Sequence, residues 1–299
     1  PPVNAGYAWE NGQVVGVEGQ EGRLFDLTAT LDALIENPES ITSSRRLNLQ
    51  TSTLRPDVND PTPFLGQVQQ RVNNQLELIG YDPFTNNEVR WPISPEIYTR
   101  WLEASPVSLT LREDAFLPYV DQLNASLNND GGNLRYIAAD EAMAFLRDAI
   151  AQSQEEIYLR VRYRSTDYEV QTGDTAMAIA RREGIPFFLL EEANSGRDLN
   201  VLSPGDSLQI PSRDVTMANP PIASKRIIVD LNAQHLVAFE NGQQVFSWPI
   251  SSGVPNAVTS PGVYQILNHD PLAEGSSSTL CDSAGLVCGT WEMNWFMGI

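Results

Sequence analysis

Residues 168–211 constrain the fold more than any other part of this 299-residue chain. Residues Tyr168 to Val170 alternate apolar and polar side chains, as a half-buried strand requires. The run Gly173-Asp174-Thr175 predicts a turn and a helix start, where either of its last two side chains can cap the helix. Pro186 can open a second helix at its first position. Pro204-Gly205 predicts a turn before a closing strand. The segment is therefore predicted to form a βααβ module.

This pattern is similar to the LysM domain, which binds N-acetylglucosamine-containing polymers such as peptidoglycan and chitin. The resemblance implies that the sugar lies in a groove between the first turn and the loop before the last strand. The glycan-binding residues that it implies are Gly173, Asp174, Thr175, Asn200, Val201 and Leu202. Amide and backbone groups of the groove would bond the N-acetyl group. The alternative is a small packing module that binds nothing, because a fold does not by itself prove a function.

The formal net charge of −19 limits the possible partners. A surface this acidic repels nucleic acid, so nucleic-acid binding is excluded. It also repels anionic wall polymers, so binding to a cell wall would depend on neutral sugar contacts. The sequence has no apolar run long enough to cross a membrane. It has no signal peptide and begins Pro1-Pro2-Val3, which predicts a processed or trimmed N-terminus.

Cys281 and Cys288 are the only cysteines, and they flank six small, turn-prone residues. This spacing favours a disulfide that closes a hairpin in an oxidising compartment, and two free thiols are the alternative. A nucleophilic Cys288 with His269 as its base is a third, less favoured interpretation. Two cysteines are too few for a structural zinc site, and we expect no metal and no cofactor.

The first half of the chain contains an internal repeat. A helix is predicted at residues 26–35 and a strand at 45–51. The same order returns as a helix at 139–150 and a strand at 156–163. A recurring helix-then-strand order predicts two copies of one unit.

We expect these α+β units at residues 1–60 and 61–166, with the first beginning part-way through its pattern. Within the second, strands flank a turn at Asp82-Pro83, and Ser94-Pro95 predicts a capped helix start. Trp91 and Trp101 are predicted to be core residues, with sugar stacking as the alternative.

This half resembles the peptidoglycan-binding domain that often precedes bacterial wall-crosslinking domains. The resemblance is carried by Pro2-Val3-Asn4-Ala5, by the stretch 9–22 and by Gly22-Arg23-Leu24-Phe25-Asp26. A spacer that holds the rest of the protein away from a surface is the alternative.

After the module at residues 167–213, a linker rich in small residues is predicted at 214–224. Residues 225–299 then alternate like strands. Asn241-Gly242 is a two-residue hairpin signal, and a further strand is predicted at 259–266.

The order of these strands is similar to the opening half of the L,D-transpeptidase catalytic domain. The features that carry the resemblance are Val229-Asp230-Leu231, Gln234-His235-Leu236, Ser252-Gly253, Thr259-Ser260-Pro261-Gly262-Val263-Tyr264 and the aromatic stretch 291–297. The resemblance implies a β-sandwich-like domain that forms peptide crosslinks in bacterial peptidoglycan. In that family a cysteine thiolate attacks the acyl donor, a histidine activates it, and the acyl group passes to an amine.

The family's catalytic motif is a His-Gly pair followed by a Ser-x-Gly-Cys segment, and neither occurs in this sequence. His269 precedes Asp270, and neither cysteine has the expected neighbours. We therefore assign no catalytic residue. The motif would be expected to follow Gly298-Ile299, so we expect the natural protein to continue, with a natural loss of activity as the alternative.

Taken together, the sequence predicts a multi-domain α+β protein. It comprises two α+β repeat units, a βααβ LysM-like module and a partial all-β L,D-transpeptidase-like domain. We expect a bacterial protein secreted to the cell wall, with peptidoglycan as its partner. In the full-length form it would crosslink stem peptides by acyl transfer. The alternative is a non-catalytic wall-binding or envelope structural protein.

Overall fold

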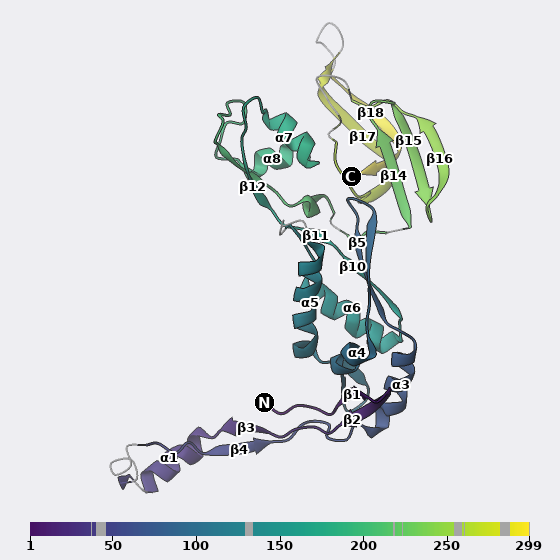
Figure 1. The fold of residues 1–299 in the computed structure, drawn as a ribbon. Coiled ribbons are helices and arrows are strands. Elements are labelled where there is room, and N and C mark those ends of the chain that lie inside the picture. The colour runs from purple at the N-terminus through teal and green to yellow at the C-terminus, as the bar shows by residue number, and fades with distance from the viewer. Residues whose placement is uncertain are drawn as a thin grey trace. The chain divides into compact units, whose positions relative to one another are not determined.

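The computed structural model describes residues 1–36, 38–39, 46–128, 134–217, 219–222, 224–253, 259, 261–281 and 288–298, without the side chains of 275–281 and 288–291. The chain is 30% helical and 34% strand, so the predicted mixture of α and β structure is confirmed. It divides into two compact units (Figure 1). The first unit comprises residues 1–80, 89–123 and 138–159, and the second comprises 81–88, 124–137 and 160–299.

The first unit is organised around a four-stranded antiparallel sheet in the order β2-β1-β7-β8. These strands are β1 (Gly6–Glu10), β2 (Gln13–Val17), β7 (Leu102–Ala104) and β8 (Leu109–Leu111). A separate two-stranded antiparallel sheet pairs β3 (Gly22–Phe25) with β4 (Thr51–Leu54), and α1 (Leu27–Glu36) lies between them in sequence. Among the described residues, the other helices that lie wholly in this unit are η1 (Thr62–Phe64), α3 (Leu65–Asn73), α4 (Pro95–Trp101) and α6 (Ala139–Gln152).

Four further elements contribute residues to both units. They are α5 (Glu113–Leu127) and the strands β5 (Glu77–Asp82), β6 (Asn87–Pro92) and β10 (Glu156–Arg160). The three strands form a sheet in the order β10-β5-β6.

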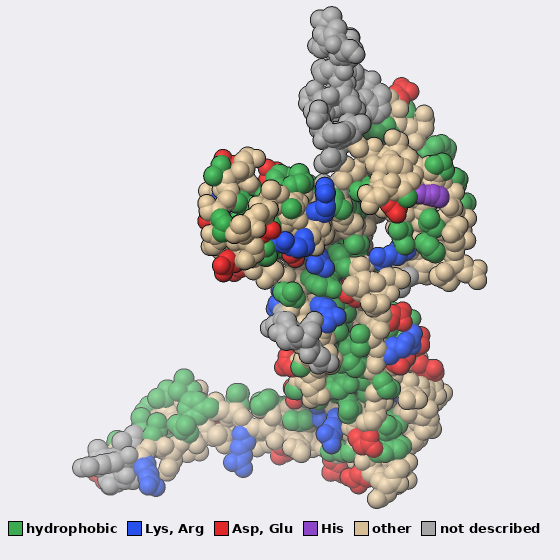
Figure 2. All heavy atoms as spheres, turned by 45° about the horizontal axis from the view of Figure 1, so that its top comes forward, with side chains coloured by type: hydrophobic (Ala, Val, Ile, Leu, Met, Phe, Trp, Pro, Cys, Tyr) green, Lys and Arg blue, Asp and Glu red, His purple; other side chains and the backbone are tan. Residues whose placement is uncertain are grey.

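The core of the first unit is centred on Trp101, whose side chain is 2% exposed. Its indole ring packs edge-to-face against Phe116 and Tyr119, each with 4.9 Å between ring centroids. The prediction that Trp101 is a core residue is therefore confirmed, whereas Trp91 is only half-buried. In contrast, the apolar side chains Leu27, Leu31 and Ile35 of α1 are exposed, and Figure 2 shows hydrophobic side chains at the surface there.

Four small antiparallel sheets lie in the described residues of the second unit. Their strands are β9 (Arg135–Tyr136), β11 (Arg162–Tyr163), β12 (Thr166–Glu169), β13 (Ser207–Ile210), β14 (Lys225–Asp230), β15 (His235–Glu240), β16 (Gln243–Pro249), β17 (Asn268–Cys281) and β18 (Cys288–Gly298). Its short helices are α7 (Ala176–Glu183), α8 (Phe187–Ala193) and η2 (Arg213–Thr216). The sheets pair β11 with β9, β12 with β13, and β17 with β18, and β14-β15-β16 forms a meander.

Two of the predicted strands are wrong. Residues 46–50 have no regular structure, and the strand of that region is β4 instead. The described part of 259–266 is also irregular, although the sequence alternates. Alternation shows which side chains could be buried on one face, but a strand also needs a partner backbone to complete its hydrogen bonds.

Candidate functional site

The βααβ module is held together by a compact apolar core. The nine buried core residues are Val170, Ala176, Ile179, Ala180, Ile185, Leu190, Leu199, Leu208 and Ile210. Strands β12 and β13 pair from Thr166–Ile210 to Glu169–Ser207. Beyond that pair, Val170 N–H donates to the Asp206 carbonyl (2.8 Å), and Gly205 N–H donates to the Val170 carbonyl (2.9 Å). The bases of the two predicted binding loops therefore lie together at one end of this ladder.

The first loop is a tight turn into α7. Gly173 has φ +89°, in the left-handed region that glycine adopts without steric cost. The Thr175 Oγ1 accepts a hydrogen bond from Ala178 N–H (3.2 Å), so Thr175 rather than Asp174 is the N-cap. At the other end of α7, Gly184 takes φ +68° and its N–H donates back into the last turn. The second helix begins one residue later than predicted, because Pro186 is its N-cap.

The Asp174 carboxylate is bound within the module. Its Oδ2 accepts hydrogen bonds from the Tyr168 hydroxyl (2.6 Å) and from Gln171 N–H (2.9 Å). Its Oδ1 pairs with Arg182 Nη1 at 3.2 Å, and the Arg182 guanidinium lies 4.7 Å from the centre of the Tyr168 ring. The hydrogen bond from Tyr168, followed by those from Gln171 and Arg182, lowers the pKa of Asp174 below its usual value. The Asp174 carboxylate thus stabilises the turn through bonds to other residues of the same module.

The second loop is built on two aspartates that the sequence analysis did not single out. The Asp198 Oδ1 accepts hydrogen bonds from Asn200 N–H (2.9 Å) and from Asn200 Nδ2 (3.0 Å). Asp206 Oδ2 accepts from Ser203 N–H (2.9 Å) and pairs with Arg197 Nη1 at 3.3 Å. Such local aspartate-to-backbone bonds form turns, so Asp-x-Asn and Ser-Pro-Gly-Asp were the signals available in the sequence.

The six predicted glycan-binding residues differ in their surroundings. Thr175 directly precedes the buried Ala176, and Leu202 packs against the same core. Gly173, Asn200 and Val201 are exposed, and Val201 is 71% exposed. The three exposed residues named here therefore offer backbone groups, one amide and one apolar side chain. These groups suit contacts with a neutral sugar better than contacts with an ion.

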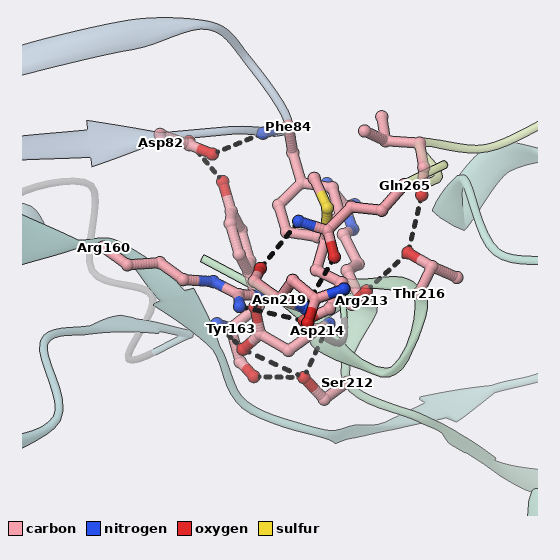
Figure 3. Close-up of polar contacts among 12 residues, drawn as sticks. Asp82, Phe84, Arg160, Tyr163, Ser212, Arg213, Asp214, Thr216, Asn219 and Gln265 are labelled. Atoms are coloured by element: carbon pink, nitrogen blue, oxygen red, sulfur yellow. Dashed lines mark hydrogen bonds and ion pairs between the residues drawn. The ribbon is translucent and has the colours of Figure 1, made fainter. Parts of the chain in front are cut away.

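The segment that follows the module is fixed by a polar network rather than extended (Figure 3). The Arg160 guanidinium donates to Asp214 Oδ1 (2.8 Å) and to the Met217 carbonyl (3.0 Å). Asp214 Oδ2 accepts from Tyr163 N–H (2.8 Å), and the Ser212 hydroxyl donates to the Tyr163 carbonyl (2.5 Å). These bonds hold η2 against β11.

Tyr163 connects the same network to the turn between β5 and β6. Its hydroxyl donates to Asp82 Oδ2 (2.7 Å), and its ring packs edge-to-face on Phe84 at 5.2 Å between centroids. Burial, together with the hydrogen bond to Asp82, raises the pKa of Tyr163 above its usual value. The phenol is therefore a neutral hydrogen-bond donor at every pH at which proteins normally work.

Further bonds join this segment to residues before β17. The Thr216 hydroxyl donates to the Val263 carbonyl (2.6 Å). Asn219 N–H donates to Gln265 Oε1 (2.7 Å), and Gln265 Nε2 donates back to the Asn219 carbonyl (2.6 Å). The predicted linker thus contains residues of a 3₁₀ helix. Its Thr216 side chain and its Asn219 backbone bond Val263 and Gln265, which lie about 46 residues later in the chain.

The C-terminal sheet forms as the strand pattern predicts. Asn241 (φ +51°) and Gly242 (φ +75°) make the two-residue turn between β15 and β16, which confirms the hairpin prediction. Strand β16 lies at one edge of this sheet, and Phe246 and Trp248 stack on it with 4.7 Å between ring centroids.

In the final hairpin, Cys281 and Cys288 are directly opposite each other in the β17–β18 register. Their side chains lie outside the described residues, so the disulfide remains a prediction. His269 pairs with Met297 at the other end of this hairpin. On β18, Met297, which faces His269, lies nine positions from Cys288, and at about 3.3 Å per residue this is roughly 30 Å. A catalytic pair of His269 and Cys288 is therefore excluded by the register.

Comparison with known families matches two parts of the chain. Residues 168–211 match the LysM domain, and residues 224–280 match the L,D-transpeptidase catalytic domain. The chain therefore carries a LysM domain followed by an L,D-transpeptidase-type segment. This combination is that of a cell-wall, enzyme-like protein.

A curated relative is the YkuD protein of Bacillus licheniformis, whose name assigns it to the L,D-transpeptidases. It is 32% identical over 108 residues, which cover 36% of this chain and 63% of that relative. The chain thus spans less than two thirds of the relative's length.

Two solved structures also show similarity. One is a cysteine-to-serine mutant of the Enterococcus faecium L,D-transpeptidase, with 15% identity, a TM-score of 0.33, and coverage of 79% of this chain and 78% of that one. The other is the Ldtfm-avibactam carbamoyl enzyme, with 15% identity, a TM-score of 0.31, and coverage of 78% and 77%.

Within the described ranges, no helix has both the length and the apolar character needed to cross a bilayer. In the same ranges, no three His, Cys, Asp or Glu side chains are grouped so that they could hold a metal ion.

Proposed function

We propose that this protein works at the bacterial cell envelope, where its LysM domain binds the N-acetylglucosamine-containing glycan of peptidoglycan. We propose further that the L,D-transpeptidase-type domain crosslinks stem peptides by acyl transfer. The observation that carries the proposal is the tandem match of a wall-binding module and a wall-crosslinking domain on one chain. We propose secretion and the disulfide at Cys281 and Cys288 as parts of the same function.

We propose the glycan contacts at Gly173, Asp174, Thr175, Asn200, Val201 and Leu202. The support is that both loops leave one end of the β12–β13 ladder and that Gly173, Asn200 and Val201, which are exposed there, carry no charge. The role of Asp174 in this proposal is indirect, because its carboxylate bonds Tyr168, Gln171 and Arg182. It would hold the turn whose backbone contacts the sugar.

Sedimentation with purified peptidoglycan tests the binding. Val201→Glu places a charge on the second loop, and we expect at least about a tenfold loss of bound protein, since desolvating a carboxylate against a neutral sugar is costly. Phe188→Glu is the matched control, because Phe188 is also an exposed apolar residue of the module (61%) but lies in the first turn of α8. Wild-type protein that stays in the supernatant would refute the binding proposal.

Crosslinking is tested with the full-length gene product and purified stem peptides, followed by mass spectrometry for crosslinked dimers. A crosslinked dimer that forms only when the protein is present supports acyl transfer. Wall binding without dimer formation would favour the non-catalytic alternative.

A further inference from the structure

A cavity of about 220 Å³ lies within the first unit, away from the LysM domain. One wall is a single face of α3, because Gln67, Gln70, Arg71 and Asn74 follow the i, i+3, i+4, i+7 spacing of one helical face. Tyr98 of α4 and Gln154, just after α6, complete the polar lining. Four amide side chains thus surround one guanidinium and one phenol.

The guanidinium of Arg71 is the unusual feature of this cavity. Its Nη1 is buried and, among the described residues, has no hydrogen-bond partner. A buried donor without a partner costs about 1–3 kcal/mol, and more when it is charged. Native proteins contain few such groups, and each one calls for an explanation, such as a ligand that completes the bond.

Tyr98, which also lines the cavity, is a neighbour of Arg71. Its side chain is buried, and burial raises the pKa of the Tyr98 phenol, whereas the neighbouring Arg71 guanidinium opposes that rise. The phenol is therefore uncharged at neutral pH and does not neutralise Arg71. The positive charge of Arg71 remains available to a ligand.

The size and charge of the lining narrow the class of ligand. Ligand pockets for drug-sized molecules are about 300–1,000 Å³, so this cavity fits a smaller group. Glu155 is the one acidic residue of the lining, and it is exposed, so water screens its charge. A planar guanidinium whose Nη1 has no partner among the described residues matches a carboxylate, and the surrounding amides match peptide groups.

We propose that this cavity binds the carboxylate end of a short peptide or a single amino acid, with Arg71 bonding the carboxylate. The amide side chains of α3 bond the adjoining peptide group. This proposal does not rest on glycan binding by the LysM domain, since all of its residues belong to the first unit.

A nuclear magnetic resonance titration of the isotopically labelled chain tests it. The probes are N-acetylalanine, which has a carboxylate, N-acetylalaninamide, which is its neutral counterpart, and free alanine. We expect N-acetylalanine to shift the Arg71 side-chain signal and the amides of Gln70 and Asn74, and the amide probe to shift none of them. Free alanine that binds equally well identifies a single amino acid as a ligand, and weaker binding identifies a peptide end. Both outcomes support the carboxylate site.

Arg71→Met is the variant and Arg100→Gln the control, since Arg100 is an exposed arginine of α4 that does not line the cavity. We expect Arg71→Met to weaken N-acetylalanine binding about tenfold or more, as loss of a charge-assisted hydrogen bond does. Its melting temperature should match or exceed that of the wild type, because the substitution removes an unsatisfied buried donor. Arg100→Gln should bind like the wild type.

Two results would overturn the proposal. One is a wild-type titration in which the carboxylate and its amide give equal shifts or none, which needs no variant. The other is a clear fall in melting temperature for Arg71→Met with unchanged binding, which would make Arg71 a structural residue.

Discussion

The guanidinium of Arg160 and the carboxylate of Asp214 form a buried ion pair, with 2.8 Å between Nη2 and Oδ1 and side chains that are 7% and 11% exposed. The pair links β10 to η2, which are 54 residues apart in sequence. A buried pair of this kind adds little net stability when intact, but it costs much when one partner is lost. The main effect of the Arg160–Asp214 pair is therefore to fix the position of the segment after the LysM domain, and its net contribution to stability is small.

Asp214→Ala is expected to lower the free energy of unfolding by about 3–5 kcal/mol, because it leaves the charge of Arg160 buried without a partner. Urea-induced unfolding followed by circular dichroism measures the loss. Lys225→Gln is the control, since it breaks the exposed Lys225–Glu240 pair and should cost less than about 1 kcal/mol. The double variant Arg160→Met/Asp214→Leu should recover more than half of the loss. An Asp214→Ala protein as stable as the control would contradict this account.

Gly184→Ala is expected to destabilise the LysM domain by about 1 kcal/mol, because φ +68° is strained for any residue with a Cβ atom. Amide hydrogen exchange in α7 should quicken about fivefold. Gly66→Ala, in the first turn of α3, adds its methyl group to open space and should stabilise α3 by about 0.5 kcal/mol. Equal effects of the two substitutions on stability would show that the backbone conformation of Gly184 is not the cause of the destabilisation.

The turn at Asp174 should weaken in acid. The folded pKa of Asp174 lies below the ordinary value of 3.8, so its contribution to stability is present above that value. The contribution is lost as the pH falls through the folded pKa. The Gln171 amide, which donates to Asp174, should therefore shift with a midpoint below 3.8 in a nuclear magnetic resonance titration. Asp174→Asn should abolish this transition, and a midpoint above 3.8 would contradict the prediction.

The facing positions of Cys281 and Cys288 favour a disulfide. Opposite residues of an antiparallel pair have Cα atoms about 4.5–5.5 Å apart, within the range that a disulfide spans. Thiol titration of the unfolded, oxidised protein should find no free thiol, and reduction should lower stability by roughly 2–3 kcal/mol. Cys281→Ser/Cys288→Ser should behave like the reduced protein. Two reactive thiols under oxidising conditions would favour the free-thiol alternative.

Local signals predicted the LysM domain well. The closing strand predicted after the Pro204-Gly205 turn is β13 (Ser207–Ile210), because its alternation and that turn act over a few residues. Thr175 and Asn241-Gly242 were found for the same reason. The helix at 139–150 was also confirmed, since Ala142, Leu146 and Ala149 keep one face apolar.

Features that depend on distant partners were not predictable from one sequence. No local pattern pairs Arg160 with Asp214, or places Arg71 beside residues about eighty positions later. The strand expected at 259–266 failed for a related reason. Val263 and Gln265 bond Thr216 and Asn219 instead of a neighbouring strand. The predicted repeat of two α+β units and the glycan contacts of the six loop residues stay predictions.

Strand β16 also affects how the molecule behaves in concentrated solution. Its seven residues carry no charge, all are exposed, and one side of its backbone has no strand beside it among the described residues. Such an edge readily pairs with the same edge of another molecule. The net charge of −19 opposes that encounter by mutual repulsion, and this protection weakens as salt screens it. Added salt should therefore favour association of the protein through β16, although this strand has no charged side chain of its own.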